Sequence, residues 1–372
     1  MSDFRHTFRH ALLRPEDPVA AAVKVVDSVG YGLALVVDDK NRLLGSVTDA
    51  SIRQCILSRI GFDQPVRMIM EPSMADSRLV RIEGSAYAVS TDETNVVTGL
   101  SRAEQAAPAV AEHPVVLMVG GKGERLRPLT DNCPKPLLKV KGKPLLERTI
   151  ERLSGQGFKN VYLTVHHYAS MIESFFETGS RWGVNIEYLH EKERLGTAGA
   201  LGMLPAENIE RPILVMNGDL VTTIKFPDLL AFHRRCGSVA TMCVAPYDVA
   251  IPYGVVAHEG FAMRGILEKP VERHFINAGI YILNPSALHL VPKGKPFDMP
   301  MLFDRLMEAG ERVGVCPLRE QWIDIGSVDT FEQAQRECID DEDNEELRAR
   351  MASELPVVQS TGRLGTVGPF IL

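Results

Sequence analysis

The amino-acid sequence predicts an α/β protein with a Rossmann-like, mixed but mainly parallel sheet covered by helices, preceded by a smaller α/β unit. Three observations lead to this prediction. From Pro114 onward, short apolar stretches alternate with helical ones. The first apolar stretch, Val115–Val119, runs directly into the glycine-rich segment Gly120–Gly123, which is typical of a buried strand that ends in a glycine loop. A chain of 372 residues also exceeds the usual size of one compact core.

The elements of the C-terminal part follow from its apolar runs and its helical periodicity. After the first strand at Val115–Val119, further strands are expected at Val161–Val165, Val184–Leu189, Ile213–Asn217, Val239–Val244 and Gly279–Leu283. Helices are expected at Pro144–Leu153, Leu229–Arg235 and Asp329–Cys338. Because helices separate several of these strands, the strands should lie mainly parallel to one another.

The N-terminal part indicates a small unit of its own. Its pattern predicts a helical stretch from Pro18, strands at Leu33–Val37 and Leu43–Val47, a polar turn at Asp38–Asn41 and a helix at Ala50–Ile60. Residues 71–112 are less regular and end in an Ala-rich stretch that we interpret as a linker. We therefore expect three regions: residues 1–112, residues 113–338, and an acidic tail over residues 339–372.

Composition and charge restrict the partners and the compartment. The net charge of −7 offers no broad attraction for a nucleic-acid backbone. The six cysteines are scattered without zinc-site spacing, as in a reduced cytoplasmic protein. Charged residues interrupt the first fifteen positions, and no apolar run is long enough to cross a bilayer. We expect a cytoplasmic protein that binds neither nucleic acid nor membrane.

Gly120, Gly121 and Gly123 allow a backbone to approach a phosphate closely, and Arg125 follows within the same segment. Taken alone, the glycines fit a phosphate-binding loop and an ordinary strand-to-helix turn about equally well. The spacing does not fit a dinucleotide-binding GxGxxG motif, and the Gly-Lys-Ser/Thr ending of a Walker A loop is missing. The segment Pro134-Lys135-Pro136-Leu137-Leu138 adds a lysine that two prolines hold on a stiff backbone.

At this point the chain resembles the sugar-1-phosphate nucleotidyltransferase family, whose signature is a GGxGxRLxPLT loop followed by PKPLL. Later blocks resemble the family in the expected order: His190–Gly199, Val215–Asp219, Glu268-Lys269-Pro270, Asn277-Ala278-Gly279 and Asp324-Ile325-Gly326. The resemblance covers most of residues 114–335. It implies the nucleotide-diphospho-sugar transferase fold, which is GT-A-like.

The resemblance also implies roles for individual residues. It makes Arg125, Lys135 and Asp219 catalytic, and it assigns a Mg²⁺ cofactor to Asp219 and Asp324. It places the sugar 1-phosphate against Gly254, Glu268, Lys269 and Asn277. The nucleoside triphosphate would lie against Met118, Gly120, Gly121, Gly123, Glu191, Gly196 and Thr197.

Asp219 and Asp324 also have a structural alternative. On turn statistics alone, an Asp after Asn-Gly is more often a turn residue than a ligand, by roughly two to one, and Asp324 before Gly326 has the same alternative. Asp219, however, follows the apolar strand Ile213–Met216, and ligands gather at the carboxyl ends of strands in open parallel sheets. Two carboxylates, phosphate oxygens and water form the usual surroundings of Mg²⁺.

The preference for one nucleobase rests on Glu191 and Glu193. A carboxylate can accept two hydrogen bonds from the N1–H and 2-amino groups of guanine, whereas uracil and thymine offer one N–H donor. This favours GTP, although a solvated carboxylate at a helix start fits the sequence equally well. The loop also resembles that of guanylyltransferases acting on mannose or heptose phosphates, but uridylyl or cytidylyl transfer stays open.

Residues 18–70 resemble a CBS module, on the segment from Leu43 to Arg53. The usual pattern has Asp where Ser51 stands, so a carboxylate that would hold a nucleotide ribose is missing. A nucleotide effector and a plain dimerisation role therefore both stay open. Bacterial guanylyltransferases for glucosamine 1-phosphate have a similar arrangement of a CBS module and a transferase.

The expected function is Mg²⁺-dependent transfer of a nucleoside monophosphate from GTP or another nucleoside triphosphate to a sugar 1-phosphate. The products would be a nucleotide sugar for surface glycans and pyrophosphate, made by a homo-oligomer. Two alternatives stay open: a uridylyl- or cytidylyltransferase for another phosphorylated substrate, and a catalytically silent regulatory subunit.

Overall fold

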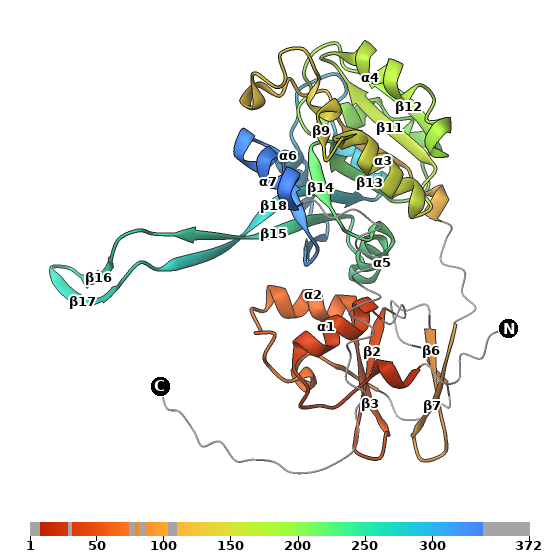
Figure 1. Ribbon diagram of the computed structural model, residues 1–372, viewed down its shortest axis with the longest axis vertical. Helices are drawn as coiled ribbons and strands as arrows, with labels where there is room; N and C mark the ends of the chain where they lie inside the picture. The colour runs from red at the N-terminus through yellow and green to blue at the C-terminus, as the bar shows by residue number, and fades with distance from the viewer. Residues whose placement is uncertain (1–7, 29–31, 74–78, 82–86, 103–109, 338–372) are drawn as a thin grey trace.

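The computed structural model describes residues 8–28, 32–73, 79–81, 87–102 and 110–337 (Figure 1). The expected acidic tail and most of the expected linker lie outside the described residues, as does Cys338. Among the described helices, none is both long and apolar enough to cross a lipid bilayer.

A seven-stranded sheet forms the centre of the C-terminal unit. Four of its six strand pairings are parallel, and both pairings of β18 are antiparallel. The sheet is therefore mixed and mainly parallel, as predicted from the sequence. In spatial order its strands are β12 (Asn185–His190), β11 (Asn160–Val165), β8 (Val115–Met118), β13 (Ile213–Asn217), β18 (Val271–Leu283), β15 (Ala240–Ala250) and β19 (Val313–Pro317).

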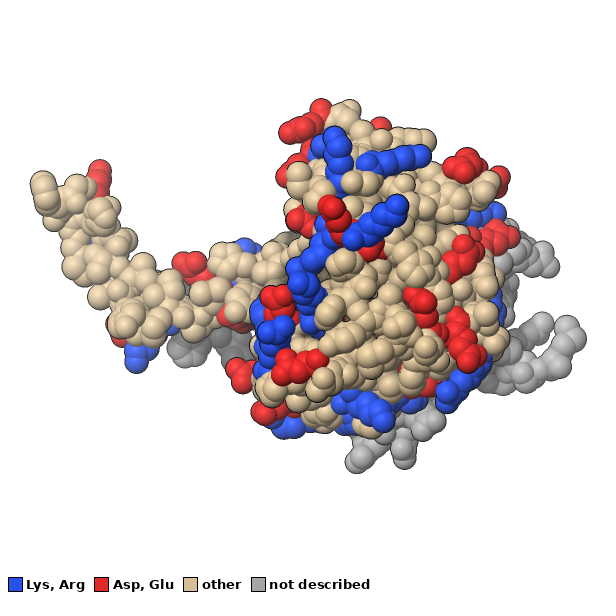
Figure 2. All heavy atoms as spheres, turned by 90° about the horizontal axis from the view of Figure 1, so that it is seen from above, with Lys and Arg blue, Asp and Glu red and all other residues tan. Residues whose placement is uncertain are grey.

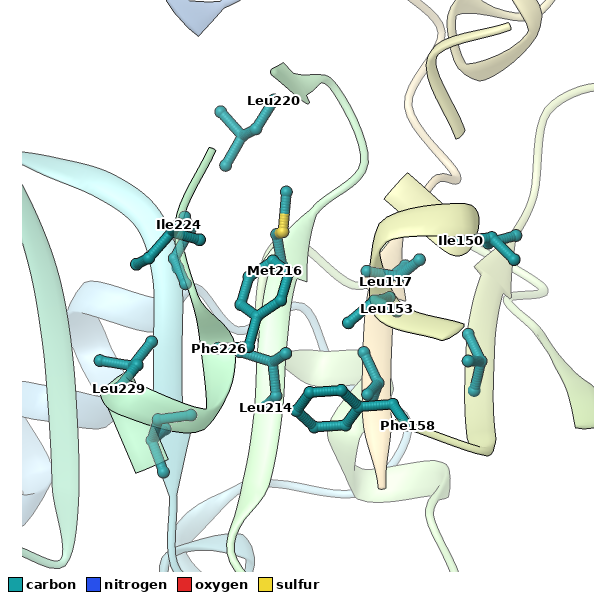
Figure 3. Close-up of a cluster of buried hydrophobic side chains, with 14 of the residues drawn as sticks. Leu117, Ile150, Leu153, Phe158, Leu214, Met216, Leu220, Ile224, Phe226 and Leu229 are labelled. Carbon is teal, nitrogen blue, oxygen red and sulfur yellow. The ribbon is translucent and has the colours of Figure 1, made fainter. Parts of the chain in front are cut away.

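Helices cover both faces of this sheet because its central strands bury side chains in both directions. Leu117 of β8 belongs to one apolar core and its neighbour Val116 to another, as the period of two in a strand requires. On the first face, Phe158 and Phe226 meet edge to face with ring centroids 6.1 Å apart (Figure 3). Helices α3 (Leu145–Gly155), α4 (Ala169–Phe176) and α5 (Phe226–Cys236) pack on this first face, and α6 (Met299–Glu308) packs on the second.

Short strands and a last helix complete the C-terminal unit next to the carboxyl ends of the parallel strands. They form a third apolar cluster, which includes Leu126, Val140 and Ile325. The elements are the pair β9 (Lys139–Val140) and β10 (Lys143–Pro144), the pair β14 (Leu220–Thr222) and β20 (Trp322–Asp324), and α7 (Val328–Glu337).

The N-terminal module, residues 8–102, has its own apolar core. The predicted strands Leu33–Val37 and Leu43–Val47 are confirmed as β2 and β3. The predicted second helix ends at Leu57 rather than Ile60, because Arg59 adopts a left-handed backbone with φ of 55°. The module contains β1 (Leu12–Leu13), α1 (Val19–Ser28), β2 (Leu33–Val37), β3 (Leu43–Thr48), α2 (Asp49–Leu57) and β4 (Glu71–Pro72), followed by a sheet of β5 (Leu79–Arg81), β6 (Tyr87–Thr91) and β7 (Val97–Arg102).

A network of buried charges joins the module to the C-terminal unit. The side chain of Arg53, which is fully buried, makes ion pairs with Asp49 at 2.6 Å and Glu320 at 2.5 Å. Arg319 makes ion pairs with Asp49 at 2.7 Å and with Asp27 at 2.8 Å. These contacts connect helix α2 to the residues that follow β19. Removing one partner would leave the other charge buried and unpaired, which is strongly destabilising.

A long two-stranded ribbon, which we call the arm (residues 246–275), projects from the C-terminal unit (Figure 1). It consists of the outer halves of β15 and β18, which stay paired out to Ala250 and Val271. Beyond these residues, β16 (Val255–Glu259) pairs with β17 (Ala262–Leu267). The strands expected at Val239–Val244 and Gly279–Leu283 are therefore only the buried inner parts of longer strands.

Candidate functional site

The glycine loop and Asp219 meet at the carboxyl edge of the large sheet. Strands β8 and β13 are parallel, with Met118 opposite Asn217, so the segments that follow them start side by side. The backbone N–H of Gly218 donates to the carbonyl oxygen of Met118 at 2.9 Å. A Cβ atom on Gly218 would lie 2.4 Å from the Val119 side chain, so only glycine permits this approach.

A hydrogen bond from Thr130 holds the glycine loop in place. Gly123 has a φ of 67°, and its carbonyl oxygen accepts a 2.8 Å hydrogen bond from the Thr130 hydroxyl. A Cβ atom on Gly123 would lie 2.9 Å from the Thr130 side chain and 3.2 Å from that of Lys135. No heavy atom lies within 4 Å of the Cβ position of Gly121, so this side of the loop is open to a ligand.

Lys135 reaches from the proline-flanked segment to Asp219. Its ammonium group donates to the Asp219 carboxylate over 2.5 Å, and its side chain is nearly buried. Pro134 has the extended backbone that a proline pair favours, with φ of −63° and ψ of 141°. The stiff segment therefore holds one positive charge at the carboxyl edge of the sheet.

Asp324 joins the same cluster through the pairing of β14 with β20. Leu220 pairs with Asp324, and the N–H of Ile325 donates to the carbonyl oxygen of Asp219 at 3.1 Å. The Asp324 side chain reaches the surface, but the surrounding protein limits its hydration. This desolvation, followed by the negative charge of Asp219, raises the pKa of Asp324, while Lys135 and Arg125 act in the opposite direction.

Arg125 completes the group of charges. Its guanidinium nitrogens lie 3.6 Å from the Cβ position of Gly326, two residues after Asp324. Arg125 is exposed, and within the described residues its guanidinium makes no ion pair or hydrogen bond. The structure therefore gathers two carboxylates and two cations beside the glycine loop, from three regions of the sequence: residues 125–135, Asp219 and Asp324.

The residues present fit a hard divalent cation such as Mg²⁺. Asp219 Oδ1 is buried and has no hydrogen-bond partner, which leaves a carboxylate oxygen free to bind a metal. Asp324 supplies further oxygens, the donor type that Mg²⁺ prefers. No group of three or more His, Cys, Asp or Glu side chains that could hold a metal occurs among the described residues. A metal at this position would therefore need oxygens of the substrates as well.

The predicted nucleobase loop borders the glycine loop. Glu191 Oε2 accepts a 2.9 Å hydrogen bond from the N–H of Leu195, and Oε1 lies 3.2 Å from the Cβ position of Gly120. One carboxylate oxygen therefore shapes the loop and the other faces the glycine loop. Glu193 is exposed.

Asp298, which the sequence did not single out, anchors the other end of this loop. It precedes helix α6, and its Oδ1 accepts hydrogen bonds from the N–H and the hydroxyl of Thr197 at 2.9 and 3.2 Å. Gly196 has a φ of 77°, and a Cβ atom there would lie 2.5 Å from Asp298 Oδ1. An Asp shortly before a helix with Pro300 in its first turn is a cap signal, but it does not predict a contact with a loop far away in the sequence.

The structure divides the residues that the resemblance assigns to the sugar. Asn277 lies on β18 at the carboxyl edge, where Gly279, with φ of 70°, packs on the side chain of Asn217. Gly254, Glu268 and Lys269 lie close together on the arm. The arm projects away from the sheet (Figure 1). The structure thus brings together the residues predicted to be catalytic, to bind metal and to bind the nucleotide, and it leaves three of the four predicted sugar residues apart.

Three curated relatives are all named as nucleotidyltransferases of a hexose 1-phosphate. A mannose-1-phosphate guanyltransferase of Yarrowia lipolytica is 35% identical over 225 residues, which are 58% of this chain and 61% of that protein. A UTP–glucose-1-phosphate uridylyltransferase of Synechocystis sp. is 31% identical over 241 residues, 59% of this chain and 62% of that protein. The mannose-1-phosphate guanylyltransferase catalytic subunit beta of Danio rerio is 35% identical over 224 residues, 58% and 62% of the two chains.

The chain thus spans about three fifths of the length of these relatives. The family profile described as nucleotidyl transferase matches residues 114–341, which include the glycine loop, Lys135, Asp219 and Asp324. This match covers more than half of the chain. The chain belongs to the nucleotidyl transferase family.

Proposed function

We propose that this protein transfers a nucleoside monophosphate from a nucleoside triphosphate to a sugar 1-phosphate and releases pyrophosphate. The observation that carries the proposal is the cluster of Arg125, Lys135, Asp219 and Asp324 beside the glycine loop. Both substrates are anions, so bringing them together requires positive charge at the site of reaction. Names of curated relatives that act on mannose 1-phosphate and glucose 1-phosphate support a sugar phosphate as the acceptor.

The reaction is a single in-line displacement. An oxygen of the sugar 1-phosphate attacks the α-phosphorus, a new P–O bond forms, and the bond to the β-phosphate oxygen breaks with loss of pyrophosphate. Lys135 neutralises charge near the reacting phosphorus, and Arg125 binds the departing pyrophosphate. Asp219 and Asp324 would hold a Mg²⁺ ion, which supplies positive charge to phosphate oxygens when it is bound.

GTP is the proposed nucleotide. Oε1 of Glu191 faces the glycine loop while Oε2 accepts from the N–H of Leu195. The two lone pairs of Oε1 could accept from both the N1–H and the 2-amino group of guanine, whereas uracil offers one N–H donor. Two of the three relatives named above are guanylyltransferases. The uridylyltransferase relative makes UTP the second candidate.

We expect Glu191→Gln to reduce the preference for GTP over UTP by about tenfold, because a hydrogen bond to a charged acceptor contributes about 1.5–3 kcal/mol. Glutamine keeps an oxygen for the N–H of Leu195, so the loop should keep its shape. The measurement is kcat/KM for both triphosphates. Glu193→Gln is the matched control on the same loop, and an unchanged ratio in the Glu191 variant would exclude this residue as the source of base preference.

We expect Asp298→Ala to raise the KM for the triphosphate about tenfold while kcat changes little. The variant removes two hydrogen bonds that fix Thr197, and a loss of 1.4 kcal/mol in binding is a factor of ten. Steady-state kinetics measure the effect. Asp304→Ala, an exposed residue on the same helix, should leave both parameters unchanged; an equal loss in both variants would point to damage to helix α6 instead.

Asp324→Asn should change metal affinity and stability in opposite directions. The pKa of Asp324 is raised in the folded protein, so its ionised form costs some folding free energy above that pKa, and this cost disappears as the pH falls through it. Asparagine removes the charge, so the melting temperature should rise slightly while the Mg²⁺ concentration for half-maximal rate increases. In the wild type, the Mg²⁺ requirement should increase as the pH falls toward the raised pKa. A lower melting temperature would show that the carboxylate is stabilising instead.

The direct test is turnover by the purified full-length chain. The protein is incubated with Mg²⁺, each of the four nucleoside triphosphates and a panel of sugar 1-phosphates, and pyrophosphate is measured. We expect pyrophosphate only when both substrates are present, fastest with GTP. Pyrophosphate that forms without a sugar phosphate would show that the acceptor is not a sugar phosphate and would overturn the proposal. No product from any pair would overturn it as well and favour the silent regulatory subunit.

The N-terminal module is proposed to have a packing role within the chain rather than a role in nucleotide sensing. Ser51 is buried and belongs to a reciprocal capping box with Thr48, and its hydroxyl also donates to Glu71 at 3.1 Å. The residue that stands where the CBS pattern has an aspartate is therefore used within the fold. A homo-oligomer in the cytoplasm that makes nucleotide sugars for surface glycans completes the proposal.

A further inference from the structure

The arm leaves an unusual amount of apolar surface uncovered. Ten of the nineteen exposed large apolar side chains in the described part of the chain belong to it. Tyr253 is 74% exposed and Phe261 fully exposed, and every residue of β16 is exposed, so neither face of the ribbon is covered. Figure 2 shows the arm extending freely from the body, with few charged atoms on its visible face.

Such a ribbon needs a partner. An isolated pair of strands is marginally stable in water, and contiguous apolar patches of this kind mark contacts with another protein. The arm is nonetheless firmly connected to the sheet: its strands stay paired without a gap from Val244–Asn277 to Ala250–Val271. The arm is therefore in a position to contact another protein molecule.

The arm also carries the exposed charged side chains of Glu268 and Lys269. Glu268 and Gly254 are in contact, since Glu268 Oε2 lies 2.8 Å from the Cβ position of Gly254, and the N–H of Lys269 donates to the carbonyl oxygen of Tyr253 at 3.3 Å. Among the described residues, neither the Glu268 carboxylate nor the Lys269 ammonium makes an ion pair or side-chain hydrogen bond. Both side chains are exposed on the arm, so they are accessible to the hydroxyls and the phosphate of a ligand.

These groups cannot serve the catalytic cluster of their own chain while the ribbon stays paired. Val271 precedes Asn277 by six residues of extended strand, which at about 3.3 Å per residue places it about 20 Å from the carboxyl edge. Glu268 and Lys269 lie further out still. Only six residues connect Pro270 to Asn277, and all of them are paired with β15 or its extension.

We infer that the arm of a second copy of this chain completes the active site. Its Glu268 and Lys269 would bind the hydroxyls and the phosphate of the sugar 1-phosphate next to Asp219, Asp324 and Asn277 of the other copy. A second identical chain is the partner because every chain has both a catalytic cluster that lacks these two groups and an arm that nothing covers. The arm of one chain can therefore complete the cluster of the other. A two-fold exchange satisfies both chains at once and buries both arms. This inference rests on the proposed transferase function.

Complementation between two variants tests the inference. Asp219→Asn, with an intact arm, and Glu268→Ala/Lys269→Ala, with an intact metal site, are co-expressed with different affinity tags and purified through both tags. In the mixed dimer, one site combines an intact cluster with an intact arm from the other chain, so about half of the wild-type activity is expected. Each variant purified alone should be nearly inactive.

Three results would overturn the inference. A mixed oligomer without activity would mean that each arm serves its own chain after folding back. Failure to obtain a mixed oligomer would mean that the chain acts alone, and full activity of the arm variant by itself would mean that Glu268 and Lys269 do not contact the substrate. Inactive wild-type protein would instead contradict the proposed function, so the two failures are distinguishable.

A second measurement addresses the apolar contact. We expect Tyr253→Ser/Phe261→Ser to shift the protein from dimer to monomer in sedimentation velocity and to lower its activity. Met171→Ser removes an apolar side chain of helix α4 that is 39% exposed and should leave the dimer intact. A Tyr253/Phe261 variant that sediments like the wild type would show that the arm is not the contact between copies.

Discussion

Lys135→Ala is expected to reduce kcat by about 10²–10³, the scale observed when one fixed electrostatic contact to a transition state is removed. The Lys135 ammonium group lies 2.5 Å from the Asp219 carboxylate, and two prolines stiffen the backbone on either side of Lys135. The ammonium group is therefore already in position when negative charge develops in the transition state. Without it, the two anionic substrates repel each other more strongly and the carboxylates of Asp219 and Asp324 lose their nearest cation. Pyrophosphate release under saturating substrates measures kcat.

Lys139→Ala provides the control for this prediction. Lys139 lies four residues further along the same segment, and it is exposed, so its loss should leave kcat unchanged. Circular dichroism of both variants shows whether the fold is kept, since Asp219 would be left partly buried without its partner. If the Lys135 variant is folded and turns over substrate at the wild-type rate, Lys135 has no role in catalysis.

Asp219→Asn should reduce activity by at least 10³-fold, more than any other single change. It removes the carboxylate whose Oδ1 is buried and unpaired and whose Oδ2 accepts from Lys135. Asparagine has nearly the same shape and keeps an oxygen for Lys135, so the expected loss comes from charge and not from packing. Activity is measured over a range of Mg²⁺ concentrations, because a weakened metal site would show as a partial recovery at high Mg²⁺.

The comparison for this variant is Asp329→Asn, an exposed carboxylate in the first turn of α7. It changes the net charge by the same amount but lies outside the cluster of charges. Equal losses in the two variants would mean that general electrostatics, and not a specific ligand, limits the rate.

Much of the fold could be predicted from the sequence because its buried strands are unambiguous. Val115–Val119 and Ile213–Met216 are continuous apolar runs with a glycine close behind them, and their strands lie at the centre of the sheet. The arm was not predicted, because strand prediction relies on one buried face. The outer halves of β15 and β18 bury neither face within this chain, so their sequence carries no such periodicity.

The site could be predicted only in part for a related reason. Asp219 follows a buried strand, so its position at the carboxyl edge could be inferred, whereas its proximity to Asp324 depends on the long-range pairing of β14 with β20. Asp298 contacts Thr197 across about a hundred residues of sequence, and no local pattern indicates such a contact. The family resemblance predicted Asp324 as a site residue, but it did not indicate Asp298.

Direct measurement of metal binding tests the central claim, which is that Asp219 and Asp324 together hold a divalent cation opposite Lys135 and Arg125. Electron paramagnetic resonance of Mn²⁺, used in place of Mg²⁺, counts bound ions in the presence of a non-hydrolysable GTP analogue. The account predicts one tightly bound ion per active site in the wild type and a loss of that ion in both Asp219→Asn and Asp324→Asn. Mn²⁺ binding that is unchanged in both variants would contradict it.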